Sequence, residues 1–274
     1  MGVTEPVRAG TTDLAAMPAG REIGQHLHNV LEAVDFRSTD LHSDVQRRLG
    51  RSMLLEGLDH GLIADGLVTA MSTPLAPLSD TRLVEIGRSD RLDELKFDLR
   101  LANAHGRVRM ADLCRSVAEA SPDDPYAAYF SDLADRIGGL QVSGHLIGFI
   151  DAVLRIPGDD GPRFVVVDYK SNRLHRQGDP DWLENYTAEA MHSAMVSHDY
   201  PLQAFLYSVA LHRYLRWRLG RSYDPSAHLA GSTYLFLRGM VGQIDSDGRA
   251  LGVSIWEPPI EAILTADRIL AGAR

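Results

Sequence analysis

The sequence predicts an α/β fold in which helices cover both faces of a sheet and an extra helical block precedes it. Three observations predict this arrangement. Apolar residues recur at helical spacing near the start, alternating and continuously apolar segments follow in the middle, and further helical segments then surround one more strand. At 274 residues the chain can bury a full core, as one large domain or one and a half.

Helical periodicity defines the N-terminal block. Between residues 20 and 34 the apolar positions lie three or four apart, at Ile23, Leu27, Val30, Leu31 and Val34. Further helices are expected over 41–58, 110–119 and 126–137. Residues 1–18 are rich in Gly, Thr, Ala and Pro and are expected to form a linker-like or frayed N-terminus. This leaves 19–274 as the expected folded domain.

Strand patterns begin after this block. Residues 95–101 alternate between apolar and charged, which indicates a half-exposed strand. Strands around 145–156 and 163–169 are joined by the turn-forming residues 157–162, a connection short enough for an antiparallel hairpin. The remaining expected elements are helices over 182–197 and 201–219, the second with Pro201 in its first turn, a strand over 233–237 and a closing helix over 260–271.

Composition excludes several classes of protein. The net charge of −9 is unlike that of a dedicated DNA coat, although a local groove could still be positive. Cys114 is the only cysteine, which excludes an internal disulfide and a cysteine-ligated zinc or iron–sulfur site. No apolar stretch is long enough to span a bilayer and no signal-peptide core is present, so a cytoplasmic location without a membrane partner is expected. The P-loop pattern GxxxxGK[ST] is also missing.

Two acids and an amine carry the strongest chemical signal. Asp151 ends Gly-Phe-Ile-Asp, and Asp168 and Lys170 follow an apolar strand in Val-Val-Val-Asp-Tyr-Lys-Ser-Asn. Residues two apart on a strand point to one face, so Asp168 and Lys170 address one site. A divalent cation between the two carboxylates would offset the cost of burying them, a layout that suits metal-dependent phosphodiester hydrolysis. The alternative is an ordinary surface ion pair.

Longer motifs extend this pattern. They are Gly148-Phe-Ile-Asp151, Asp168-Tyr-Lys-Ser-Asn172, Tyr200-x-Leu-Gln203-x-x-x-Tyr207 and Tyr234-Leu-Phe-Leu-Arg-Gly239. In this order they resemble the C-terminal nuclease domain of RecB, the beta subunit of exonuclease V, in the PD-(D/E)xK superfamily. The resemblance runs from about residue 20 to the last helix. It implies a restriction-endonuclease-like core, a central mixed sheet flanked by helices on both faces.

The resemblance also implies roles for particular residues. Asp151 and Asp168 become ligands of Mg²⁺ (one or two ions, with Mn²⁺ as a substitute), Lys170 becomes the catalytic lysine, and the Tyr169 backbone carbonyl is a further ligand. The family has a histidine ligand on an N-terminal helix, which makes His28 the candidate, against a solvated helix histidine as the alternative. Glu94 falls where the family has an acid on the preceding strand, with an exposed surface acid as the equal alternative.

A second group of residues is expected to contact nucleic acid or support the site. Gln203 and Tyr207 lie four apart on a helix and share one face. In the family this pair lies beside the active site, where it can contact the nucleic-acid backbone and support the catalytic lysine, with a hydrogen-bonded pair at the edge of the core as the alternative. Asn172 is expected to orient the site. Basic side chains follow in two clusters that could hold DNA phosphates, with an ordinary solvated charged face as the alternative. They are Arg173, His175 and Arg176 after the catalytic strand, and Arg213, Arg216, Arg218 and Arg221 on the long helix. Trp182, Tyr186 and Trp217 are interpreted as packing residues rather than as surfaces for base stacking.

The expected function is therefore that of a Mg²⁺-dependent deoxyribonuclease in recombinational double-strand-break repair. By resemblance, it would cut single strands supplied by a helicase motor in another polypeptide or segment, beside RecC- and RecD-like subunits. The alternative is a non-catalytic nuclease-like module that binds DNA or docks a partner subunit, which retention of both acids and the lysine disfavours. A sequence-specific restriction-type endonuclease also stays open, although no base-reading element is evident.

Overall fold

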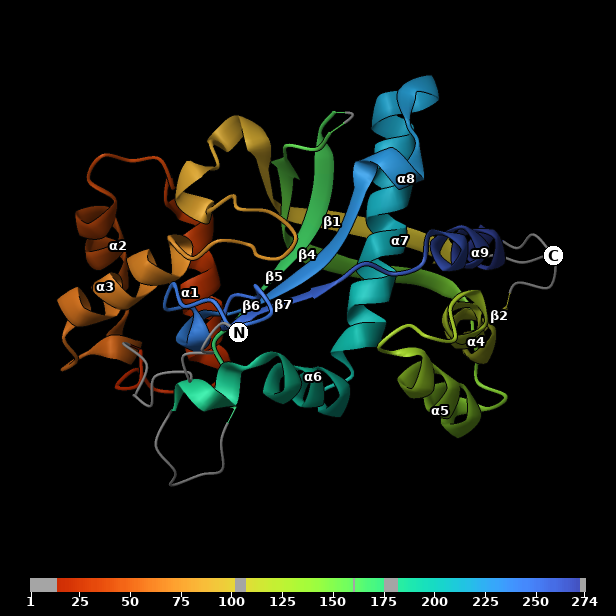
Figure 1. The fold of residues 1–274 in the computed structure, drawn as a ribbon, viewed down its shortest axis with the longest axis horizontal. Coiled ribbons are helices and arrows are strands. Elements are labelled where there is room, and N and C mark those ends of the chain that lie inside the picture. Colours follow the sequence, from red (N-terminus) through yellow and green to blue (C-terminus); the bar gives the residue numbers. More distant parts are fainter. Residues whose placement is uncertain (1–13, 102–106, 160, 175–181, 272–274) are drawn as a thin grey trace. The chain divides into compact units, whose positions relative to one another are not determined.

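The computed structural model describes residues 14–101, 107–159, 161–174 and 182–271. Five strands form one mixed sheet in the order β1 (Arg91–Leu101), β4 (Gly144–Ile156), β5 (Arg163–Lys170), β6 (Leu229–Phe236) and β7 (Val253–Trp256). A separate antiparallel pair joins β2 (Val108–Arg109) to β3 (Gln141–Val142). The sheet and its many helices confirm the expected α/β class with a central mixed sheet (Figure 1).

The chain divides into two compact units. The first unit contains residues 1–93, 167–194 and 233–255, and the second contains 94–166, 195–232 and 256–274. The helices of the first unit are α1 (Arg21–Ala33), α2 (Leu41–Leu49) and α3 (His60–Met71), with most of α6 (Ala188–Ser197) and the short 3₁₀ turns Met53–Leu55, Leu83–Glu85, Arg88–Asp90, Leu183–Tyr186 and Leu237–Gly239. The second unit holds α4 (Met110–Ala120), α5 (Ala127–Ile137), α7 (Tyr200–Leu219), α8 (Pro225–His228), α9 (Ile260–Ala271) and the 3₁₀ turn Gly220–Ser222.

Burial follows the sequence patterns that predict these elements. In α1 the residues Ile23, Leu27, Val30 and Leu31 are buried, as their spacing predicts. Strand β5 carries Val165, Val166 and Val167, and all eight residues of β6 are buried, as expected for central strands covered on both faces. Helix α7 begins with Pro201 in its first turn, where the missing N–H of proline costs no hydrogen bond.

Several expected elements differ from the observed ones. The helix expected over 41–58 is wrong beyond Leu49, because the chain leaves the helix at Gly50 and continues into the 3₁₀ turn at Met53–Leu55. The segment 182–197 contains a 3₁₀ turn and α6, separated by Thr187 in an extended conformation. Helix α3 and strand β7 were not expected. Helix α3 is apolar nearly all round, so it shows little of the periodicity that identifies a surface helix.

The N-terminal segment is partly packed into the first unit. Residues 1–13 of the expected linker lie outside the described residues, but Leu14 and Met17 are 2% and 0% exposed. The packed part of the first unit therefore begins before residue 19.

Candidate active site

Asp168 and Lys170 lie together at the end of β5 in the first unit. The Lys170 Nζ is 2.7 Å from the Asp168 Oδ2, and their side chains are only 15% and 3% exposed. The Lys170 ammonium also lies 5.2 Å from the centre of the Tyr234 ring on β6. The spacing of two along the strand therefore brings both groups to one face, as the sequence predicts. Each charge compensates for part of the desolvation of the other.

His28 and the Tyr169 carbonyl form a second contact in the same unit. The His28 Nε2 lies 2.8 Å from the Tyr169 backbone oxygen, and the two rings meet edge to face with their centroids 6.0 Å apart. Gly24, one helical turn before His28, allows this approach: a Cβ atom there would lie 3.2 Å from the Ser171 Oγ. Helix α1 thus packs against the residues that end β5 and brings an imidazole to them from 141 positions away in the chain.

Asp151 and Glu94 lie in the second unit. Asp151 is half-buried on β4, the strand that is hydrogen-bonded to β5 in the sheet. Glu94 is exposed and has a φ of 46°, a left-handed conformation that is uncommon for a non-glycine residue inside a strand. A local left-handed residue of this kind is typical of a β-bulge, which redirects side chains on a sheet edge.

Gln203 and Tyr207 share one face of α7, as their spacing predicts. The Gln203 Nε2 donates a hydrogen bond to the Tyr207 hydroxyl at 2.9 Å, and the Tyr207 ring meets the Phe97 ring of β1 at 5.7 Å. Gly148 of the Gly-Phe-Ile-Asp motif makes room for this ring, because a Cβ atom there would lie 2.4 Å from the Phe97 Cζ. The glycine in that motif is therefore explained by packing within the second unit.

The residues after β5 serve the packing of the first unit. The Arg173 Nη2 donates hydrogen bonds to the backbone oxygens of Ala15 and Met17, at 2.6 and 3.0 Å. Asn172 is half-buried. His175 and Arg176, which were expected to join Arg173 in a basic cluster, lie outside the described residues. In the described part of this cluster, the guanidinium group is thus already engaged with the backbone.

Arg238 is an important residue that sequence reasoning missed. It is 1% exposed, and its guanidinium group donates to the backbone oxygens of Ser171, Leu14, Met17 and Pro18. The only available signal was a charged residue at the end of an apolar strand, within the motif that begins at Tyr234. Its bond to Ser171, next to Lys170, fixes the chain where β5 ends.

The oxygen and nitrogen atoms at the end of β5 that could bind a metal ion are suited to a cation that keeps part of its water shell. Among the described residues, no three His, Cys, Asp or Glu side chains gather into a ready-made metal cage. Magnesium needs only one or two protein carboxylates and keeps water on its other coordination positions. The residues present therefore fit magnesium better than a closed four-ligand zinc site.

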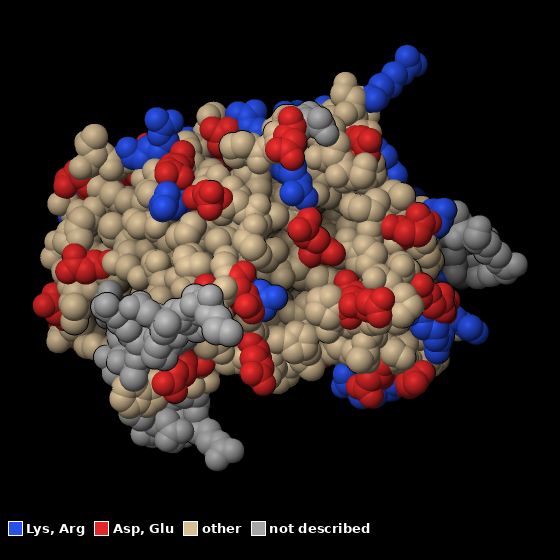
Figure 2. Space-filling model, viewed as in Figure 1, with Lys and Arg blue, Asp and Glu red and all other residues tan. Residues whose placement is uncertain are grey.

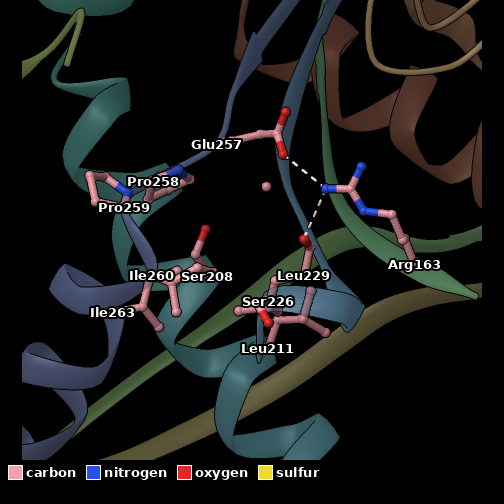
Figure 3. Close-up of a pocket in the computed structure, with 11 residues that line it drawn as sticks. Arg163, Ser208, Leu211, Ser226, Leu229, Glu257, Pro258, Pro259, Ile260 and Ile263 are labelled. Atoms are coloured by element: carbon pink, nitrogen blue, oxygen red, sulfur yellow. Dashed lines mark hydrogen bonds and ion pairs between the residues drawn. The ribbon is translucent and has the colours of Figure 1, made fainter. Parts of the chain in front are cut away.

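A cavity elsewhere in the second unit contains none of the expected site residues. Its volume is about 280 Å³, and most of its wall is apolar, including Leu211, Ile260 and Ile263 (Figure 3). Arg163 faces this cavity with its guanidinium group directed at Glu257, 2.9 Å from the Oε2, and at the Leu229 carbonyl oxygen. Its charged group is thus already paired.

Comparison with known proteins identifies relatives but no matching family model. The chain is 39% identical to the RecBCD enzyme subunit RecB of Mycobacterium tuberculosis over 280 residues, which covers 96% of this chain and 25% of that protein. The chain is homologous to the C-terminal region of RecB. RecB of Mycolicibacterium smegmatis is 39% identical over 94% of the chain, and RecB of Escherichia coli is 30% identical over 99% of it.

The chain spans about a quarter of the length of these RecB proteins, with 25%, 24% and 21% of them covered. The homology confirms the family resemblance seen in the sequence motifs. A search of the described helices for a segment long and apolar enough to cross a bilayer finds none.

Proposed function

We propose that this chain is a Mg²⁺-dependent deoxyribonuclease module that hydrolyses phosphodiester bonds of single-stranded DNA. The observation that carries the proposal is the grouping of the Asp168–Lys170 pair and the His28–Tyr169 contact around the end of β5. The strand-end D-x-K and the helix histidine that the family resemblance indicates lie close together in the first unit. Homology to RecB over 96% of the chain supports the same function.

In the proposed site, Asp151, Asp168, His28 and the Tyr169 carbonyl would hold the ion, with Glu94 as a weaker candidate for a second one. When bound, the ion would supply Lewis-acid chemistry that activates water and offsets negative charge on the phosphoryl oxygens. The protein contributes fixed groups in a poorly solvated site, where the Lys170 ammonium can donate hydrogen bonds to the attacking water and the phosphoryl oxygens. Asp168 holds that ammonium at 2.7 Å, so a lysine with three rotatable donors keeps one position.

The biological setting follows from the relatives. They are named as RecB subunits of the RecBCD enzyme. We propose that this module works beside a helicase motor and RecC- and RecD-like subunits, and trims the strands that the motor releases during repair of double-strand breaks. Gln203, Tyr207 and Asn172 would support the site or contact the strand.

A cleavage assay with matched variants tests the proposal. The purified chain is incubated with linear single- and double-stranded DNA in Mg²⁺, Mn²⁺ or EDTA, together with Asp168→Asn and Lys170→Ala. The chain contains only one other lysine, the exposed Lys96, so Lys96→Ala is the matched control for the amine. The exposed Asp135→Asn on α5 serves as the control for the acid.

We expect metal-dependent cleavage of single strands by the wild type and both controls, with a loss of at least about 100-fold in Asp168→Asn and Lys170→Ala. Circular dichroism establishes that each variant is folded. Binding of DNA by the wild type without any cleavage in either metal would instead support the non-catalytic docking module.

A further inference from the structure

A basic pocket in the second unit stands out against an acidic protein. The chain carries a net charge of −9, and on the face shown in Figure 2 acidic and basic side chains are interspersed. A pocket of about 390 Å³ is nevertheless lined by three arginines, namely Arg100 of β1 and Arg213 and Arg216 of α7, together with Asp267 and Ala271 of α9. Three arginines and one acid thus line the pocket, an excess of two positive charges among its described lining residues.

The single acid in this pocket holds two of the arginines in place. The Arg213 Nε lies 2.5 Å from the Asp267 Oδ1, and the Arg216 Nη1 lies 2.7 Å from the Oδ2. Burial alone would raise the pKa of the Asp267 carboxyl, but hydrogen bonds from His212, Arg213 and Arg216 hold that pKa well below its usual range. The carboxylate therefore stays ionised and fixes the directions of both side chains, which reduces the entropy lost when they bind a ligand.

The arginines keep donors for a ligand after these contacts. Within the described part of the chain, the Arg213 Nη1 and the Nε and Nη2 of Arg216 make no hydrogen bond, and Arg100 makes no ion pair. If these arginines served only to hold Asp267, one positive charge would be enough to neutralise its carboxylate. The pocket instead carries two more positive charges than that role requires. Arginine forks present paired N–H groups, a geometry that matches phosphate oxygens.

An exposed aromatic ring lies on the same helix as two of these arginines. Trp217 follows Arg216, lies four positions after Arg213 on α7, and is 72% exposed. Its ring lies 6.1 Å from that of Tyr214, with the Arg218 guanidinium 5.5 Å from its centre. The expectation that Trp217 packs inside the protein is therefore wrong. Aromatic rings beside phosphate-binding arginines are typical of surfaces on which the bases of single strands stack.

We infer that Arg100, Arg213, Arg216 and Trp217 form a binding site for single-stranded nucleic acid, in which the arginines hold a backbone phosphate and the indole stacks on a base. The inference rests on the proposed function in that it supplies a binding place for the DNA strand that the proposed nuclease would cut. It does not require that the chain cuts DNA.

Equilibrium binding in EDTA tests this site without any cleavage. Fluorescence anisotropy of labelled oligothymidylates is measured with wild type, Arg100→Gln and Trp217→Ala across a salt series. Arg213 and Arg216 are left intact because they hold Asp267. Arg249→Gln, on an exposed loop of the first unit, is the matched control.

We expect Kd to increase about 5- to 100-fold in Trp217→Ala with an unchanged salt dependence, because base stacking is not ionic. Arg100→Gln should weaken binding and reduce the slope of log K against log salt by about 0.7, the value for one phosphate contact on a single strand. Arg249→Gln should bind as the wild type does. Inorganic phosphate or thymidine monophosphate should compete only at concentrations far above those of the oligonucleotide.

Two results would overturn the inference. The first is that Arg100→Gln and Trp217→Ala both bind the oligonucleotide with the same affinity and the same salt dependence as the wild type. The other is competition by inorganic phosphate as strong, per phosphate, as that by the oligonucleotide, which would assign the pocket to free anions. If the wild type fails to cut DNA while Arg100 and Trp217 still determine binding, only the proposed nuclease function fails.

Discussion

Replacing Arg238 with methionine should destabilise the first unit strongly. Methionine fills a similar volume but donates no hydrogen bonds. The variant loses the bonds from Nε to Ser171, from Nη1 to Leu14, and from Nη2 to Met17 and Pro18, with lengths of 2.8, 2.5, 2.8 and 2.8 Å. The acceptors are backbone oxygens in a nearly dry environment, so they cannot find equal partners without a structural change.

The variant protein can respond to the lost hydrogen bonds in two ways, and the one that costs less free energy sets the size of the destabilisation. If the segment 14–18 stays in place, four carbonyl oxygens lose a charged donor, and each bond of this kind contributes about 1.5–3 kcal/mol, from which the cost of burying the guanidinium group must be subtracted. If the segment detaches, its carbonyls become hydrated but Leu14 and Met17 leave the core, at about 1.5–3 kcal/mol each. Detachment of the segment therefore sets the expected loss at about 3–6 kcal/mol in the free energy of unfolding.

Urea unfolding measures this loss, and hydrogen exchange at residues 14–18 reports whether the segment detaches. Arg249→Met is the matched control, because that side chain is exposed, and it should change stability by less than about 0.5 kcal/mol. In a background carrying Leu14→Ala and Met17→Ala the segment is already loosened, so the further loss on Arg238→Met should be smaller by at least about 1 kcal/mol.

The reasoning would be refuted by a loss below about 1 kcal/mol for Arg238→Met with unchanged protection of residues 14–18. Strict additivity with the double alanine background would also contradict it, because it would mean that Arg238 acts independently of the segment.

Three further predictions concern the second unit. Gly231→Ala should cost at least about 2 kcal/mol in thermal unfolding, because Gly231 has a φ of 80° and a Cβ there would lie 2.4 Å from the Trp256 carbonyl oxygen. Asp267→Asn should cost about 3 kcal/mol at pH 7, and this difference from the wild type should shrink as the pH falls below the pKa of an unfolded aspartate, about 3.9, since the folded pKa is depressed. Burial raises the pKa of the Cys114 thiol to about 11, so iodoacetamide should alkylate it only after unfolding.

Local patterns in the sequence predict the elements that carry the candidate site. The spacing of Asp168 and Lys170 places them on one face because side chains alternate along a strand, and the ion pair confirms it. The four-residue spacing of Gln203 and Tyr207 likewise predicts that they share one face of α7, where the structure shows them hydrogen-bonded to each other. These relations depend only on the period of a strand or helix.

Other contacts of the candidate site depend on which distant segments pack together. Local periodicity in the sequence does not predict such tertiary contacts. The approach of His28 to Tyr169 joins residues 141 positions apart, and here the family resemblance, not the periodicity, indicated the residue. Helix α3 was missed because its residues are apolar on nearly all sides, so that its sequence lacks the polar stripe of a surface helix. Arg238 looked like an ordinary charged residue until its partners in the N-terminal segment were known.

By itself the sequence determined the α/β class, the strand-end acid and lysine, and the relationship to RecB, because periodicity and motif order are properties of the chain. Only the tertiary structure decided that Arg173 and Arg238 are engaged with the N-terminal segment, that Trp217 is exposed, and that Arg100 joins Arg213 and Arg216 around Asp267. The physical reason is that a charged or aromatic side chain acts through its neighbours in space, and those neighbours come from distant parts of the chain.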